Sequence, residues 1–90
     1  SETAVDLPVL LAIVSSFRDK SLRSGLVCFG EIGLAGEIRP VRFGEERIAA
    51  AAKQGFTQAI VPASNAPKKA PDGIEVVGVK RVREVLEQAF

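Results

Sequence analysis

The chain has 90 residues, enough for one domain or part of one, and its 47% hydrophobic content is ordinary for a folded globular protein. A net charge of +1 gives no global attraction to nucleic acid or to a membrane, so any such binding requires a local patch. The lack of histidine and the single cysteine exclude a zinc site of the usual ligands and an internal disulfide.

The first predicted element is a helix over residues 6–18, where apolar side chains recur with the spacing of one helix face: Leu7, Leu10, Leu11 and Val14. Val9, Ala12 and Ile13 fill the remaining sides, so we expect this helix to be buried all round. Asp6 is its expected N-cap residue. Pro8 then lies in the first turn, where a missing N–H does no harm.

Two short strands are expected next, over residues 26–32 and 37–41. The first begins with the apolar run LVCF, which is typical of a central strand. Gly30, Gly33 and Gly36 predict a turn or bulge between the two strands. Pro40 cannot donate to a central ladder, so the second strand should be short or lie at a sheet edge.

An alanine-rich segment over residues 44–54 is the clearest predicted helix. Glu45 and Glu46 lie at the positive end of its dipole and Lys53 at the negative end, and Gly55 suits the residue after it. Strands are expected over residues 58–62 and 74–78, separated by a proline-rich loop, and a last helix covers residues 80–89. This alternation of helices and short strands predicts an α/β (α+β) domain.

Residues 30–41, GEIGLAGEIRPV, carry the strongest family signature. They resemble the Gly-Glu-Ile-x-Leu-x-Gly-x-x-x-Pro-Ile run of Lon proteases, and the similarity extends without a gap from Ala4 to Asn65. The resemblance implies the fold of the Lon proteolytic domain, which is like domain 2 of ribosomal protein S5, without the N-terminal strands of the full domain. Loss of those strands should expose a sheet edge and apolar surface, so we expect self-association or marginal stability.

A finer resemblance is to the RadA/Sms recombination proteins, carried by DLP at residues 6–8, SSFRD at 15–19, VCFGE at 27–31 and GLAGEIR at 33–39. That family resembles ATP-driven ring motors of homologous recombination and DNA repair, with a C-terminal Lon-like domain that lacks peptidase activity and helps to assemble the ring. The resemblance implies a homo-oligomer, DNA contact through the parent protein, and a RecA-type recombinase as partner. ATP, magnesium and zinc would bind in upstream domains, because this chain has no GxxxxGK[ST] loop, and no cofactor is expected here.

The serine–lysine dyad of Lon is absent in this register. The serine falls on Ala4, whose methyl group cannot attack a carbonyl, and the lysine base falls on Glu45, which has the opposite charge. We therefore expect no catalytic residue in the chain, with a relocated hydroxyl–lysine dyad as the alternative. Two other function classes stay open: a fragment of an active Lon-like, ATP-dependent serine peptidase, and a partner-binding pseudo-peptidase domain of another AAA+ or chelatase-type protein.

Arg39, Arg42 and Arg47 flank the signature turn and are the predicted DNA-contacting residues. The alternative is an ordinary solvated surface in which acidic residues are interspersed. We assign no aromatic residue to this group and expect no stacking on single-stranded bases. Cys28 should be a buried small residue rather than a nucleophile, because the chain has no histidine to activate it.

The longest apolar stretch, residues 7–14, is too short to span a membrane, and the first residues lack the positive start of a signal peptide. We therefore expect a cytoplasmic protein without membrane contact. The chain contains no methionine, so we also expect it to begin inside a longer protein.

Overall fold

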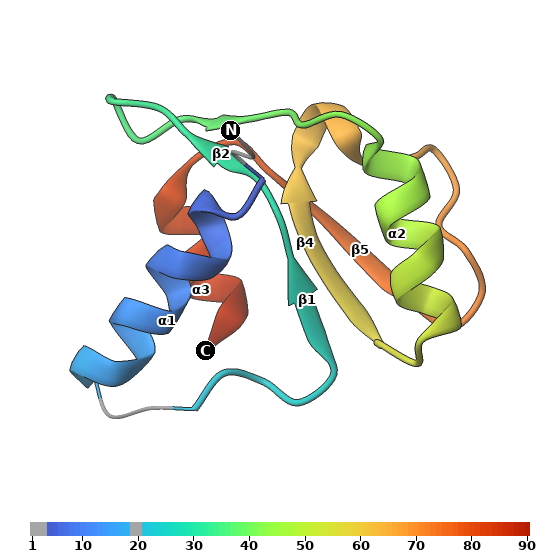
Figure 1. The fold of residues 1–90 in the computed structure, drawn as a ribbon, viewed down its shortest axis with the longest axis horizontal. Helices are drawn as coiled ribbons and strands as arrows, with labels where there is room; N and C mark the ends of the chain where they lie inside the picture. The colour runs from blue at the N-terminus through green and yellow to red at the C-terminus, as the bar shows by residue number, and fades with distance from the viewer. Residues whose placement is uncertain (1–3, 19–20) are drawn as a thin grey trace.

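A computed structural model describes residues 4–18 and 21–90, and places helices on both faces of a parallel sheet (Figure 1). Helices α1 (Asp6–Arg18) and α3 (Val82–Ala89) cover one face, and α2 (Gly44–Lys53) covers the other. A short 3-10 turn, η1 (Ala63–Asn65), follows the central strand. The predicted mixed α/β class is therefore confirmed.

The sheet consists of β1 (Leu26–Cys28), β4 (Gln58–Pro62) and β5 (Glu75–Val79), all parallel, in the order β1-β4-β5. In the register, Val27 pairs with Ala59, which in turn pairs with Val76. β4 is central and buried from its second residue onward, as expected for a strand covered on both faces.

The prediction of one strand over residues 26–32 is wrong. β1 ends at Cys28, and β2 (Glu31–Ile32) pairs antiparallel with β3 (Ile38–Arg39) in a separate sheet. The break occurs at Gly30 because its backbone bonds the start of α1: its N–H donates to the Ala4 carbonyl (3.0 Å), and its carbonyl accepts from the Leu7 N–H (3.1 Å).

Other boundaries differ by a few residues for identifiable reasons. The strand predicted over residues 37–41 stops at Arg39 because the N–H and carbonyl of Val41 bond the Asn65 side chain. The last helix starts at Val82 rather than at residue 80, since the Glu84 carboxylate accepts the N–H groups of Lys80 and Arg81 as a cap. β5 begins and ends one residue later than predicted, and α2 ends one residue earlier, before Gln54 and a left-handed Gly55.

Helix α1 is buried on one stripe only, so the expectation of a helix buried all round is wrong. Leu7 and Leu11 are fully buried, but Val9 and Ile13 are 53% and 62% exposed. Residues four apart share a helix face, so Val5, Val9 and Ile13 form an exposed apolar stripe. Asp6 does not cap the helix through its side chain; its carboxylate instead accepts the Ile32 N–H of β2 (3.2 Å).

The hydrophobic core has two parts, one on each face of the sheet. The part beneath α2 consists of Ala4, Phe29, Ile48, Ala51, Ala59, Val61 and Ile74. The part beneath α1 and α3 consists of Leu7, Leu11, Ile38, Ile60, Val79, Val85 and Ala89. Among the described residues, no helix is both long and apolar enough to cross a bilayer.

Candidate functional site

The two positions onto which the resemblance places the Lon dyad, Ala4 and Glu45, have very different environments. Ala4 is 2% exposed and belongs to the core beneath α2, together with Phe29 and Ile48. Glu45 is exposed in the first turn of α2. A relocated dyad would need a desolvated lysine, yet Lys53, Lys68, Lys69 and Lys80 are all exposed, and no charged residue of the described part is buried. This arrangement provides no hydroxyl–lysine pair among those residues.

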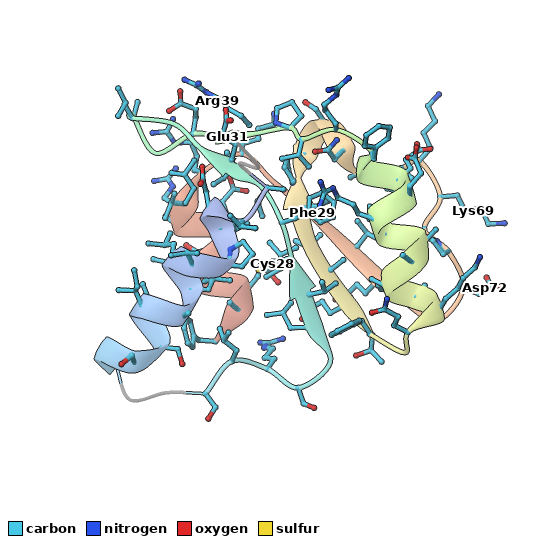
Figure 2. The ribbon with its side chains drawn as sticks, viewed as in Figure 1. Cys28, Phe29, Glu31, Arg39, Lys69 and Asp72 are labelled. Atoms are coloured by element: carbon cyan, nitrogen blue, oxygen red, sulfur yellow. The ribbon has the colours of Figure 1, made fainter. Side chains whose placement is uncertain are left out.

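Arg39, the first predicted DNA-contacting residue, is engaged by acidic neighbours on the β2–β3 hairpin. Its guanidinium lies 2.9 Å from the Glu37 carboxylate and 3.7 Å from that of Glu31. Arg39 and Glu31 are labelled in Figure 2. Hydrogen bonds from its own backbone N–H, from Arg39 and from the Ala35 N–H lower the pKa of Glu37. The bond to Glu37 likewise raises the pKa of Arg39. The positive charge of Arg39 is therefore largely offset by the carboxylates of Glu37 and Glu31.

Arg42 and Arg47 are brought together at the start of α2. Arg47 donates from Nε to the Arg42 carbonyl (3.0 Å), and its guanidinium carbon lies 5.8 Å from the centroid of the Phe29 ring. Arg47 is half-buried, and its hydrogen bond to the Arg42 carbonyl helps to hold the loop that precedes α2. Arg42 is exposed and forms no ion pair with a described residue. Of the three predicted arginines, Arg42 is thus the one whose charge is most available to a ligand.

An exposed aromatic residue, Phe43, lies between these two arginines. The ring is 64% exposed, and the Arg42 guanidinium carbon is 5.8 Å from its centroid. The prediction that no aromatic residue belongs to the arginine group is therefore wrong. Phe43 directly follows Arg42 in the sequence, but its apolar side chain would ordinarily be assigned to the core, so only the structure reveals its exposure.

Asn65 fixes the loop that carries Arg42 and Phe43. Its Oδ1 accepts the Val41 N–H (2.8 Å), and its Nδ2 donates to the Val41 carbonyl (3.0 Å). Gly44 allows this approach, since a Cβ there would lie only 2.5 Å from Nδ2 of Asn65. The sequence showed Asn65 only as the last residue of the family match. Its double hydrogen bond joins segments 24 residues apart, which no local pattern indicates.

A shallow groove lies between α2 and the proline-rich loop that follows η1. Its volume is about 340 Å³, and its lining residues are Glu45, Glu46, Ile48, Ala49, Pro67, Lys69 and Pro71. The two carboxylates therefore belong to the side of α2 that faces the loop, where Lys69 is also found (Figure 2).

Comparison with known proteins identifies the family. A family model described as subunit ChlI of Mg-chelatase matches residues 1–65. The chain is also 60% identical over 86 residues to the DNA repair protein RadA of Escherichia coli, 49% identical over 89 residues to that of Pseudomonas aeruginosa, and 45% identical over 90 residues to that of Bacillus subtilis. The chain belongs to the ChlI family and is a homologue of bacterial RadA.

The RadA homology covers nearly the whole chain but a small part of each relative. The alignments take in 96% to 99% of this chain and only 19% to 20% of the three RadA proteins. The chain thus spans about one fifth of the length of the curated relatives that it matches.

Cys28 of this RadA homologue packs against the core beneath α1 and α3 but is only partly buried, so the prediction of a buried residue is wrong in degree. It is half-buried at the end of β1, and desolvation raises its pKa to about 11, so the thiol is protonated near neutral pH. Among residues 4–18 and 21–90, no three side chains of the acidic, cysteine or histidine type gather as a metal site.

Proposed function

We propose that this chain is a non-catalytic, Lon-like domain of a RadA-type DNA repair protein that contacts nucleic acid and takes part in ring assembly. The homology to proteins named as DNA repair proteins supports the context of this proposal. The observation that carries the contact is Arg42, an exposed cation without an acidic partner among the described residues, on a loop fixed by Asn65.

The proposal that the domain is non-catalytic is supported by both former dyad positions. Ala4 carries no nucleophile and is enclosed in the core, and Glu45 is an exposed anion that cannot serve as the amine base. We expect no cleavage of casein by the chain. Cleavage that is lost when a serine or lysine of this chain is replaced would instead favour the Lon-like peptidase.

The nucleic-acid contact is tested by fluorescence anisotropy with a labelled DNA oligonucleotide over a series of salt concentrations. Arg42→Ala should weaken binding and reduce the slope of log K against log salt by about 0.7 to 0.9, the contribution of one phosphate contact. Lys53→Ala is the matched control, because it removes one exposed positive charge from the other end of α2. Equal effects of the two substitutions would show that net charge, rather than this loop, determines binding.

The exposed stripe of α1 supports the proposed self-assembly. Val5, Val9 and Ile13 lie on the face opposite Leu7 and Leu11, where they would be costly to leave in water. Ile13→Glu should shift the light-scattering mass towards the monomer without reducing stability, whereas Ser64→Glu, outside α1, should leave the mass unchanged. A wild-type chain that is monomeric at every concentration would contradict a role of this face in assembly.

The remaining proposals concern the parent protein. We place ATP hydrolysis with magnesium, and a zinc-binding motif, outside this chain, and propose a RecA-type recombinase as a partner. The parent chain should therefore hydrolyse ATP, whereas the 90 residues alone should not.

The ChlI match favours one second candidate, a partner-binding domain of a chelatase-type AAA+ protein. Binding of a protein partner would not require an arginine that contacts a DNA phosphate. A chain that binds no DNA at low salt, together with a parent that lacks DNA-stimulated ATP hydrolysis, would favour this candidate.

A further inference from the structure

Phe43 has an unfavourable backbone conformation whose free-energy cost is not offset by burial of its side chain. Its backbone is left-handed, with φ 60° and ψ 36°. Among the residues that the structure describes, Phe43 is the only one other than glycine with a positive φ. Such a conformation is unfavourable for a bulky side chain. The ring is also 64% exposed, so the strained backbone presents an apolar surface to water instead of burying it. Strain of this kind is concentrated at ligand-binding positions.

Contacts on both sides of Phe43 enforce this conformation. The Phe43 carbonyl accepts the Arg47 N–H (2.9 Å), and the Arg42 carbonyl accepts Nε of Arg47 (3.0 Å). On the other side, Asn65 holds Val41 by two hydrogen bonds. The ring is thus presented from a rigid loop, which reduces the entropy that a ligand must offset on binding.

The surroundings of the ring indicate the chemistry of its ligand. The Arg42 guanidinium carbon lies 5.8 Å from the ring centroid, so an aromatic face and a cation are offered together. Glu45 and Glu46, the nearby acidic residues of α2, line the groove towards Lys69. An exposed aromatic side chain beside an arginine is the combination that stacks an unpaired base and contacts its phosphate.

We infer that Phe43 is a stacking platform for an unpaired nucleobase and that Arg42 contacts the backbone of the same strand. This inference rests on the proposed nucleic-acid contact and makes it specific for single-stranded DNA. A duplex hides the faces of its bases, so only the arginine would contribute to duplex binding.

Phe43→Gly separates stacking from folding. Glycine readily adopts the left-handed conformation, so the urea midpoint should be unchanged or higher, while the platform is lost. Binding of an oligothymidylate of about 15 nucleotides should weaken about tenfold, within the range for loss of one aromatic side chain that stacks a base. Binding of a duplex of the same length should change less than about twofold, and so should binding of an abasic single strand.

Phe43→Trp reports stacking directly, because the chain contains no tryptophan or tyrosine. Its fluorescence should be quenched by oligothymidylate and unaffected by the abasic strand. Leu34→Trp is the control, since Leu34 is fully exposed at the turn of the β2–β3 hairpin, away from the arginine loop. Equal quenching of both variants would overturn the inference.

The two levels of the proposal fail in different ways. If Arg42→Ala weakens binding of both DNA forms and Phe43→Gly weakens neither, the phosphate contact stands and the stacking platform is refuted. If the wild-type chain binds neither form at low salt, the proposed function itself is refuted.

Discussion

Replacing Asn65 by alanine should destabilise the fold far more than its position in a short surface turn suggests. Both polar groups of the Asn65 side chain bond the backbone of Val41, at 2.8 and 3.0 Å. A net value of about 1 kcal/mol for each hydrogen bond gives a loss of about 2 kcal/mol. Val41 is only half-buried, so water can reach its freed groups and the larger penalty for fully buried orphans does not apply.

For a domain of this size, about 2 kcal/mol corresponds to a fall in Tm of roughly 8 to 16 °C. The urea midpoint should fall by about 1 to 2 M with an unchanged slope. Ser64→Ala is the matched control, because Ser64 is the exposed neighbour of Asn65 and should cost less than about 0.5 kcal/mol. Circular dichroism at matched concentrations measures both. Equal midpoints for the two variants would refute the reasoning that Asn65 fixes the loop of Arg42 and Phe43.

Two further predictions follow from ionisation. The pKa of Cys28, near 11, should make alkylation of the native chain at about pH 8 roughly 100-fold slower than alkylation of the urea-unfolded chain, and similar rates would show that the thiol is accessible as thiolate. The lowered pKa of Glu37 means that its contribution to stability is present above the unfolded pKa and is lost as the pH falls through the folded pKa. Urea midpoints measured below about pH 5 should therefore decline less steeply in Glu37→Gln than in wild type, and parallel declines would contradict this role.

Periodicity and intrinsic helix and strand propensity predicted most of the fold. Local signals mark the helix that contains Leu7 and Leu11, spaced four residues apart, the alanine-rich α2 and the strand over residues 58–62, and the structure has these elements. The errors occur at element boundaries that are determined by contacts outside the element itself. Gly30 ends β1 by bonding α1, and Glu84 moves the start of the last helix.

The candidate site was predictable in composition but not in geometry. Clustered arginines could be read from the sequence, yet nothing in it distinguished Arg39, which pairs with Glu37, from Arg42, which has no such partner among residues 4–18 and 21–90. Phe43 was missed because exposure of its aromatic ring depends on the left-handed backbone, and position 43 is not a glycine or asparagine, the residues that usually indicate that conformation.

The most direct test of the account is a nuclear magnetic resonance titration of the ¹⁵N-labelled chain with oligothymidylate at low salt. We predict that the largest amide shifts fall on residues 41–47 and that they diminish as salt is added. Shifts confined to α1 or to the proline-rich loop, or no shifts at all, would contradict it.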